Sequence, residues 1–544
     1  MHLLTLLTIF RMVVLPVQFQ DRELGTTPEQ QEVLVQQAEE YFNRQFAGTG
    51  RTFRFELGPT VVLRHSVAWY GSNYPDRKDT HLADAVREAC QAARGVVDFS
   101  ACDSDGDGMV DNVCILYAGP GEHASGEETD VYPQLGWLSA DGGVTVQAGG
   151  LTIDRFSAAP EGELGVLCHE FAHALGLPDL YDTDGAESGG ECPGLWGLSL
   201  MDTGCRGAGV PDFGAPECEL LGLGTAEPLM TGTYTLTPIA AGKRYLKAET
   251  DHDDEYFLFE ARQGGLYIDH IDRSDNPAGY SARQQKELTA RERWETGEIN
   301  NNPAHPCVRL IPADPAATGA AGVPFPGGGA ASFGSDTPSA FRAWSGAASG
   351  LALTGIRPAA DGAVTFEVVR PITIDEVAVY QDAVLIRWTP SLSLAGIQGY
   401  EVTWTDGTES WSAELPADAV SYTVEGLQPK TEYTYSVQLR CSATERYSAG
   451  GRFETRILRK GTYPYIYLAD ARRNLDGSFP AGSKIPLRVF NTSEVQEVQW
   501  TMDGAPVQPE ADGMFTLQRS GVLRARILYL DGTSETLMKE ITVQ

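Results

Sequence analysis

The sequence predicts an α+β protein, in which a mixed helix-and-strand domain is followed by a β-rich extension and two β-sandwich domains. Helical periodicity and apolar strands alternate as far as residue 225, and short strands with Gly- and Pro-rich connections follow to residue 370. Regular apolar–polar alternation fills the rest. One core rarely serves more than ~250–300 residues, so 544 residues require several domains. We expect them at 1–225, 226–370, 371–457 and 458–544.

Charge and hydropathy exclude two classes of partner. Asp and Glu number 74 against 41 Lys and Arg, which gives a formal net charge of −33. Binding to nucleic acid or to anionic lipid requires clustered cations, so we expect neither. No stretch reaches the ~18 apolar residues of a membrane-spanning helix, and no transmembrane segment is predicted.

The N-terminal residues are either a strand or the end of a secretory leader. Residues 3–10 (LLTLLTIF) are apolar, but no Lys or Arg precedes them and no small-residue cleavage site follows. The apolar run continues through Arg11 into MVVLPVQFQD. We therefore favour a buried strand, and a leader is not clearly visible.

Helix and strand signals follow one another through the first domain. Thr27 precedes Pro28 and Glu29 as a helix start, and the periodic pattern runs to Phe46. The other elements predicted in this region are a helix over 80–93, an apolar strand from residue 110 and a helix over 161–175.

Nine cysteines, an odd number, leave at least one thiol unpaired. Cys192 and Cys205 flank the segment PGLWGLSLMDTG, so a disulfide between them is one possibility. Buried free thiols are the other. Cysteine usage leaves the cellular compartment open.

Residues 371–457 alternate apolar and polar side chains in short strands. Trp388 lies in an early strand, and Tyr433 lies near a late one in SYTVEGLQPKTEYTYSV. A sandwich of about seven strands suits this pattern, and the stretch resembles a fibronectin type III module. Residues 459–544 repeat the alternation and are interpreted as an immunoglobulin-like sandwich.

The segment CHEFAHALGLPD, residues 168–179, carries the predicted chemistry. On a helix, His169 and His173 project from one face a turn apart, so both imidazoles can reach one zinc ion. Glu170 lies beside them as a general base that does not bind the ion. An HExxH pattern is expected ~0.01 times in a shuffled chain of this composition, so a helix whose histidines bind nothing is the weaker interpretation.

A catalytic zinc ion needs a third protein ligand. Gly176 can adopt a positive φ, end the helix and turn the chain back, so that Asp179 follows in an extended segment. We prefer Asp179 as this ligand. The alternative is a Glu from a later segment, for which the candidates are Glu191, Glu217 and Glu219.

Two residues near the motif are assigned structural roles. Met201 follows His169 by about thirty residues, in GLSLMD, and is expected at the tip of a tight turn that forms an apolar floor beneath the histidines. Cys168 lies about 100° around the helix from His169, so it is expected to be a packed thiol and not a ligand.

With these motifs, residues 11–370 resemble the immune inhibitor A-type metallopeptidases of the metzincin clan. The resemblance is carried by HEFAHALGLPDLYD and the later SLMD, and also by VVLPVQFQD, DSDGDGMVDNVCILYAG, EYFLFEARQ, GLYIDHID and NNPAHPCVRLIPAD. It implies a metzincin-like, secreted zinc endopeptidase. In that family pattern His169, His173 and Asp179 bind zinc, Glu170 is the general base and Met201 marks the Met-turn.

The sequence departs from the family pattern at two places. Relatives usually carry an N-terminal pro-region, which these residues do not include. Where relatives often have a Trp-Pro-His run, this sequence has Tyr132-Pro133-Gln134, so no family role is transferred to that position.

The acidic segment DSDGDGMVD is a candidate calcium site. Asp103, Asp105, Asp107 and Asp111 are spaced like the carboxylates in the first half of an EF-hand loop. Cys114 stands where such a loop usually has Glu, so a solvated acidic turn is the alternative.

Histidines outside the motif carry little functional signal. His270 and Asp272 alternate on a predicted strand, for which a structural hydrogen bond is expected in preference to substrate contact. The histidines that lack partner spacing and receive no role are His65, His81, His123, His252 and His305.

The sequence therefore predicts a secreted or cell-surface zinc endopeptidase that acts on proteins or peptides, with Zn²⁺ at the histidines and Ca²⁺ as a candidate second ion. The C-terminal modules would contact extracellular proteins or glycans. The main alternative is a catalytically inactive adhesion or binding protein that uses the protease fold as a scaffold. A zinc exopeptidase is a third interpretation.

Overall fold

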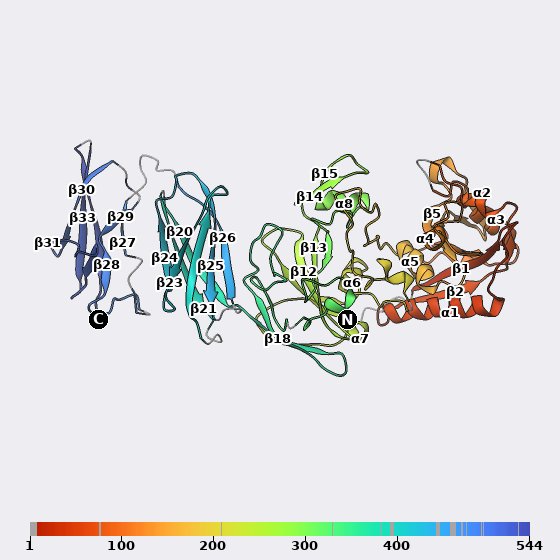
Figure 1. The fold of residues 1–544 in the computed structure, drawn as a ribbon, viewed down its shortest axis with the longest axis horizontal. Helices are drawn as coiled ribbons and strands as arrows, with labels where there is room; N and C mark the ends of the chain where they lie inside the picture. Colours follow the sequence, from red (N-terminus) through yellow and green to blue (C-terminus); the bar gives the residue numbers. More distant parts are fainter. Residues whose placement is uncertain are drawn as a thin grey trace. The chain divides into compact units, whose positions relative to one another are not determined.

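The computed structural model describes residues 8–74, 78–207, 209–328, 330–380, 382–391, 396–441, 446–456, 464–468, 472–474, 476–490, 492, 494–530 and 532–544 (Figure 1). They form two compact units, Met1–Ser332 with Gly355–Glu367 and Phe333–Thr354 with Val368–Gln544. Residues 3–7 of the apolar N-terminal run, and the expected boundary at 457/458, lie outside the described residues.

The first unit holds helices of very different length. They are α1 (Pro28–Gln45), α2 (Val67–Tyr70), α3 (Leu82–Ala93), α4 (Glu122–Ser125), α5 (Leu164–Ala174), α6 (Ala215–Leu220), α7 (Ile239–Gly242) and α8 (Ala290–Thr296). Short 3₁₀ turns are η1 (Phe99–Ala101), η2 (Ala140–Gly142), η3 (Thr203–Arg206) and η4 (Ala320–Gly322). None of the helices in the described part of the chain is long and apolar enough to cross a membrane.

The strands of the first unit are β1 (Thr8–Gln18), β2 (Arg51–Leu57), β3 (Val61–Val62), β4 (Val113–Tyr117), β5 (Gln134–Trp137), β6 (Val146–Ala148), β7 (Leu151–Ile153), β8 (Arg155–Pro160), β9 (Thr225–Pro228), β10 (Gly232–Leu236), β11 (Arg244–Glu249), β12 (Glu255–Arg262), β13 (Gly265–Asp272), β14 (Pro277–Ser281), β15 (Lys286–Thr289) and β16 (Val308–Leu310). The chain passes between the units at β17 (Phe333–Gly334), β18 (Ala352–Pro358) and β19 (Val364–Val369).

The sheet that supports the motif helix has the strand order β2-β1-β4-β8-β5, with β3 pairing beside β1. Its strands run parallel except β5, which is antiparallel to β8 and lies at the edge. Parallel strands are usually buried on both faces, and β1 fits this rule because every residue from Met12 to Val17 is buried. The mixed helix-and-strand make-up that the sequence predicts for this region is confirmed.

Alternation along β1 sends side chains into two cores. Met12 and Val14 pack with α1 and α5 on one face of the sheet. Val13, Leu15 and Val17 pack with α3 on the other. A pleated strand points successive side chains to opposite faces, so one apolar run fills both layers. Figure 1 shows α1 and α3 on opposite sides of β1.

The predicted helix over 27–46 is confirmed with ends one residue inside that range. The Thr27 hydroxyl accepts a hydrogen bond from the backbone N–H of Gln30, and the Gln30 side chain accepts one from the N–H of Thr27.

The predicted strand from Val110 begins later, at Val113. The backbone N–H groups of Val110 and Asp111 are bound by the carbonyls of Thr152 and Cys102, which holds them in a loop.

A second sheet of the first unit, ordered β16-β13-β12-β11-β9, continues the core. Its inward residues Leu258, Ile271 and Val308 belong to the same buried cluster as the residues of α1 and α5. The β-rich segment after residue 225 therefore packs on the helix-and-strand region.

The second unit is built of strands that bury aromatic residues. They are β20 (Ile372–Val379), β21 (Ala383–Pro390), β22 (Gly399–Thr405), β23 (Ser410–Leu415), β24 (Ser421–Glu425), β25 (Glu432–Arg440), β26 (Arg446–Glu454), β27 (Tyr465–Tyr467), β28 (Lys484–Pro486), β29 (Arg488–Phe490), β30 (Val495–Met502), β31 (Ala505–Val507), β32 (Met514–Thr516), β33 (Gly521–Tyr529) and β34 (Ser534–Ile541).

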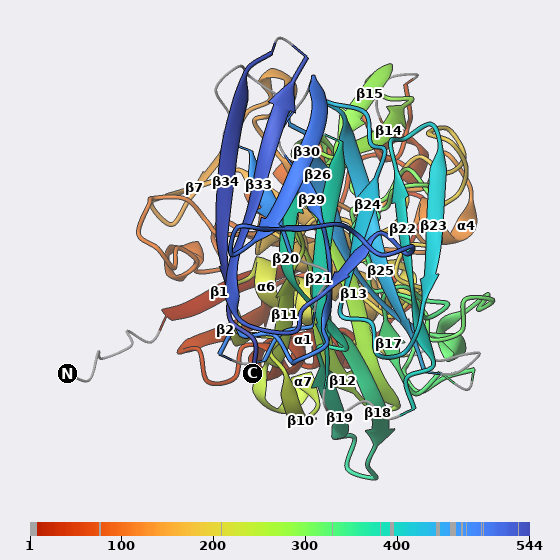
Figure 2. The ribbon, with the colours of Figure 1, turned by 90° about the vertical axis from the view of Figure 1, so that its left-hand side faces the viewer.

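Two sheets, β20-β21-β24 and β23-β22-β25-β26, enclose the first core of this unit. Trp388 and Tyr433 are both buried in it, and the Tyr433 hydroxyl accepts a hydrogen bond from the N–H of Gln428. A further sheet, ordered β31-β30-β33-β34, covers a core around Trp500 and Leu523. Its strands β30, β33 and β34 are seen in Figure 2.

Candidate metal centre

The motif helix α5 ends where the sequence predicts and starts later. It begins at Leu164 and not near 161, because the Glu161 carboxylate accepts hydrogen bonds from the N–H groups of Gly25, Thr26 and Gly119 and is held at the end of β8. After the helix, Gly176 has a φ of +103°, which reverses the chain. Asp179 is thereby directed back towards the helix.

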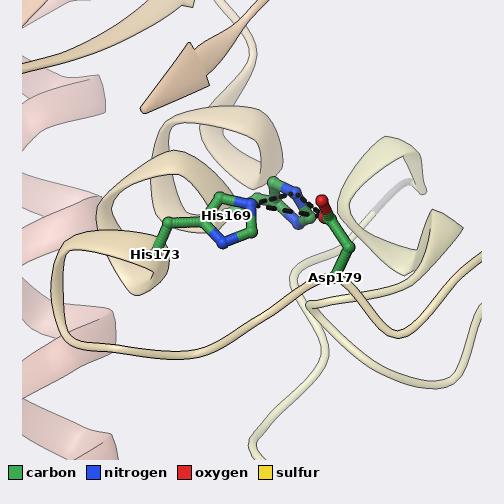
Figure 3. Close-up of side chains that lie close together, drawn as sticks. All are labelled: His169, His173 and Asp179. Carbon is green, nitrogen blue, oxygen red and sulfur yellow. Dashed lines mark hydrogen bonds and ion pairs between the residues drawn. The ribbon is translucent and has the colours of Figure 1, made fainter. Parts of the chain in front are cut away.

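The structure brings His169, His173 and Asp179 together (Figure 3). The Nε2 atoms of the two histidines are 3.2 Å apart. The Asp179 Oδ1 atom lies 3.2 Å from His169 Nε2 and 3.3 Å from His173 Nε2. Three potential ligand atoms therefore form a nearly equilateral triangle.

Both imidazoles are oriented by backbone carbonyls through their other nitrogen. His169 Nδ1 lies 2.8 Å from the carbonyl oxygen of Leu200, and His173 Nδ1 lies 2.7 Å from that of Leu177. A carbonyl only accepts, so each Nδ1 carries a proton in these contacts, and in the neutral imidazole each Nε2 has a lone pair that can bind a metal. The Asp179 Oδ1 atom is buried without a hydrogen-bond donor.

The charges of this cluster are strongly coupled. Burial alone would lower the pKa of His169, but the contact with Asp179 and neighbouring groups outweigh it and raise that pKa well above the usual value. Burial would raise the pKa of Asp179, but His169 and His173 lower it below its ordinary range. The arrangement favours a carboxylate facing positive charge.

Glu170 is the buried carboxyl group of the same helix. Its side chain is 4% exposed and lines the cleft beside the two histidines. Burial raises the pKa of Glu170, although the neighbouring histidines lower it in part. A carboxyl group in such surroundings takes up a proton more readily than one in water.

The alternative third ligands lie apart from the histidines. The Glu217 carboxylate accepts hydrogen bonds from the Ser199 hydroxyl and the Gly214 N–H. Of the other two candidates, Glu219 bonds with Tyr256 and Glu191 is exposed. Cys168, expected to be a packed thiol, is buried in the core.

Met201 lies in a buried turn that is connected to both sides of the cluster. Its N–H donates to the Ser199 hydroxyl, and its carbonyl accepts from the N–H of Leu180, the residue after Asp179. The neighbouring Leu200 carbonyl is the partner of His169. The turn therefore supports a histidine and the aspartate segment at once.

A cleft of about 430 Å³ opens on these residues. Sequence reasoning missed several of its lining residues, including His123, Tyr132, Tyr181 and Arg206. His123 bonds through Nε2 with Glu163 at 3.0 Å, and no spacing in the sequence signalled it. Tyr181 lies two residues after Asp179, and this closeness to the motif could have identified it. Its ring lies 6.3 Å from that of His169.

The acidic segment places three of its four aspartates together. The carboxylates of Asp103, Asp105 and Asp111 have oxygen atoms within 4.8 Å of one another. Asp107 is outside this group and accepts a hydrogen bond from the N–H of Met109. Cys114 is buried in β4, away from a ligand role.

His270 and Asp272 have structural partners. His270 Nε2 lies 2.8 Å from the Glu255 carboxylate, and the ring stacks on Phe257. Asp272 bonds with His305 at 2.8 Å. The predicted structural role of the β13 pair is consistent with these contacts.

All nine cysteines are free thiols in the structure. Cys192 and Cys205 are half-buried, and Cys205 lines the cleft. The sequence leaves open a disulfide or two free thiols for this pair, and the structure has the free thiols.

Comparisons with known proteins give matches in both units. Residues 17–211 match the family described as "Immune inhibitor A peptidase M6, catalytic domain", and residues 369–451 match the fibronectin type III domain. The protein "Immune inhibitor A" of Bacillus thuringiensis subsp. alesti is 30% identical over 125 residues. That match covers 19% of this chain and 18% of the relative, so the chain spans under a fifth of the relative's length.

Among solved structures, the fibronectin type III domain of the human collagen alpha-1(XX) chain is 21% identical, with a TM-score of 0.15. That match covers 18% of this chain and 88% of the solved chain. A redesigned β-sandwich protein is 20% identical over 18% of this chain and 98% of its own, with a TM-score of 0.16.

The sequence resemblance is thus confirmed for the two matched regions. The catalytic-domain match suggests a metallopeptidase. Residues 17–211 are thus similar to the catalytic domain of the immune inhibitor A peptidase M6 family, and residues 369–451 are similar to a fibronectin type III domain.

Proposed function

We propose that the chain is a zinc-dependent endopeptidase in which His169, His173 and Asp179 bind the ion and Glu170 is the general base. The observation that carries this proposal is the triangle of ligand atoms with sides of 3.2, 3.2 and 3.3 Å. Ligands at 2.0–2.1 Å from a tetrahedral zinc ion are about 3.3–3.4 Å from one another. The donor set therefore fits zinc in size and in chemistry.

The electrostatics of the triangle support a cation at its centre. Two imidazole lone pairs and a buried carboxylate oxygen without a donor face one another. These three atoms repel unless a positive charge lies between them. A catalytic site retains one open coordination position, and three protein ligands leave one.

The chain's own residues supply the proton transfers. Zinc in this position would supply a Lewis acid that polarises the scissile carbonyl and acidifies the attacking water. Glu170 Oε atoms accept the proton of that water and then deliver it to the nitrogen of the leaving amine. The raised pKa of Glu170 suits a group that must hold a proton between the two steps.

The edge of the main sheet supports cleavage within a chain. β5 pairs with β8 on one side and ends the order of the sheet, and its residues Gln134 and Leu135 line the cleft. An extended peptide can add to such an edge through backbone hydrogen bonds. A substrate bound in this way passes through the cleft, so we propose internal peptide bonds as the targets.

Glu170 also distinguishes an enzyme from a catalytically inactive scaffold. A scaffold has no use for a buried carboxyl group beside a ligand triangle, so Glu170 favours the enzyme.

We also propose calcium for Asp103, Asp105 and Asp111, with Asp107 supporting the turn. Calcium prefers such oxygen ligands.

We further propose a secreted or cell-surface protein whose metzincin-like domain precedes the fibronectin type III domain and an immunoglobulin-like sandwich over 458–544. The resemblance to immune inhibitor A-type peptidases and the β-sandwich modules motivate this location. The modules would contact extracellular proteins or glycans.

A metal assay combined with a cleavage assay tests the proposal. Purified full-length chain should contain about one zinc ion at the triangle and should cleave a fluorogenic peptide that is blocked at both ends. A chelator should abolish cleavage, and added zinc should restore it. If the protein holds no transition metal and cleaves no blocked peptide, the proposal is wrong and the chain is a catalytically inactive scaffold.

A further inference from the structure

Arg206 places an uncommitted positive charge at the cleft. It is the one Lys or Arg among the residues that line the cavity, and its side chain is exposed. Within the described ranges, no carboxylate forms an ion pair with it. Exposed arginines of this chain often do have such partners, for example Arg44 with Asp212 and Arg54 with Glu39.

The other charged groups at the cleft already have partners. His123 bonds with Glu163 at 3.0 Å. The Asp202 carboxylate accepts hydrogen bonds from the N–H groups of Gly197 and Leu195, at 2.7 and 3.2 Å. The proposed ligands and base account for the rest, so Arg206 is the charge that remains available to a bound molecule.

The backbone that carries Arg206 is fixed against the motif helix. η3 follows the Met201 turn directly, and it approaches α5 so closely that a Cβ on Gly165 would lie 1.9 Å from the Cys205 carbonyl oxygen. Thr203 and Val166 line the cleft at the same place. The backbone that carries the Arg206 guanidinium is therefore held in place at the cleft.

The negative charge of the whole chain gives a cation at the cleft a specific effect on acidic substrates. A formal charge of −33 repels acidic substrates at long range, and a cation in the cleft offsets that repulsion locally. A guanidinium matches a carboxylate with two parallel hydrogen bonds, which a neutral side chain cannot form. The chemical class that Arg206 fits best is therefore a carboxylate.

We propose that Arg206 binds the side-chain carboxylate of a substrate Asp or Glu close to the scissile bond and so gives the peptidase a preference for acidic peptides. This inference rests on the proposed function. A C-terminal carboxylate has the same chemistry, but the edge of β5 favours a substrate that continues through the cleft.

Paired peptides test the inference. A series blocked at both ends should carry Glu or the isosteric Gln at each position on either side of the cleaved bond. For the full-length protein we expect kcat/KM to be about 5- to 20-fold higher with Glu at one of these positions. Added salt should reduce this ratio, because the contact is electrostatic.

Charge reversal should change the preference and not the chemistry. Arg206→Glu should bring the Glu/Gln ratio below one, and Arg206→Gln should bring it near one. Arg94→Glu, on an exposed arginine after α3, makes the same change in net charge and should keep the original ratio. Zinc content and melting temperature would show that each variant is folded.

The outcomes separate this inference from the proposed function. Cleavage by the wild type with a Glu/Gln ratio near one at every position would overturn the role of Arg206 and leave the peptidase intact. A preference that appears only when the C-terminus is free would overturn the side-chain carboxylate. Absence of any cleavage by zinc-loaded wild type would reject the proposed function itself.

Discussion

The Nδ1 atom of His169 lies 2.8 Å from the carbonyl oxygen of Leu200. This contact joins the motif helix to the Met201 turn, and it leaves the Nε2 atom of His169 directed at Asp179. Partners of this kind fix the tautomer and the orientation of a metal-binding histidine. The turn therefore acts on the site through backbone carbonyls, and the Met201 side chain fills the core beneath it.

Asp179→Asn should weaken zinc binding by at least ~100-fold, because changes even in the partners of ligands cost 10–100-fold in affinity. The amide cannot supply the negative charge that now faces the two imidazoles. Competition with a chromophoric chelator measures the affinity. Glu219→Gln, at a candidate that the structure places beside Tyr256, should keep the wild-type affinity. If Glu219→Gln weakens zinc binding and Asp179→Asn does not, Glu219 is the third ligand.

Glu170→Gln should lower kcat by about 10²–10⁴-fold while zinc remains bound, because the amide cannot accept the proton of the attacking water. Cleavage of a blocked peptide and metal analysis on the same sample measure both properties. Glu191→Gln removes an exposed carboxylate outside the ligand cluster and serves as the matched control. If Glu170→Gln retains full activity with full zinc content, another group is the base.

Local signals in the sequence predict the helix, its end and the residues that could bind a metal. The i, i+4 spacing places His169 and His173 on one face, and Gly176 marks the reversal that brings Asp179 back. These relationships span fewer than about twelve residues, so they depend on helix geometry and on one turn. The β-sandwich pattern around Trp388 is equally local.

Long-range contacts could not be predicted in this way. The Leu200 carbonyl, the cleft positions of His123 and Arg206, and the late start of α5 all depend on tertiary packing. Glu161 has helix-compatible chemistry, yet its carboxylate binds the N–H groups of Gly25 and Gly119, which are distant in sequence. Hydrophobic periodicity reports only local spacing along the chain, so it cannot predict such partners.

Asp79 should make the stability of the fold pH-dependent. It is 5% exposed, and burial raises the pKa of its carboxyl group from 3.8 to about 7. Its Oδ2 atom accepts hydrogen bonds from the Tyr132 N–H and the Gln134 side chain at the cleft, while Oδ1 has no donor. The folded state holds the proton more tightly than the unfolded state, so the free energy of unfolding should fall as the pH rises from about 4 to 7.

Asp79→Asn should remove this slope, because the amide does not ionise and its NH₂ group replaces the unpaired oxygen. Above pH 7 we expect a gain of up to roughly 4 kcal/mol in the free energy of unfolding. Asn also tolerates the φ of +46° at this position. Urea titrations at several pH values measure the change. Asp253→Asn, on an exposed aspartate, should leave the slope as it is, and an equal effect of both variants would argue against Asp79.

Thiol labelling should divide the cysteines into two classes. Burial raises the pKa of Cys90, Cys114 and Cys218 to about 12, so these thiols are protonated and inaccessible at neutral pH. Cys192 and Cys205 are half-buried. A colorimetric disulfide reagent should therefore modify about two thiols quickly in the folded protein and all nine in denaturant.

Cys205 should be distinguished from Cys192 by its place in the cleft. A cleft-directed inhibitor should slow labelling of Cys205, which lines the cavity, and leave Cys192 unaffected. Cys205→Ser should remove one rapid equivalent and serves as the assignment control. If neither thiol reacts until a reductant is added, and mass spectrometry then gains two hydrogens, the two cysteines form the disulfide that the sequence alone left open. Rapid labelling of the buried thiols would instead mean that the cores that hold them open readily, because a packed thiol reacts only when its surroundings unfold.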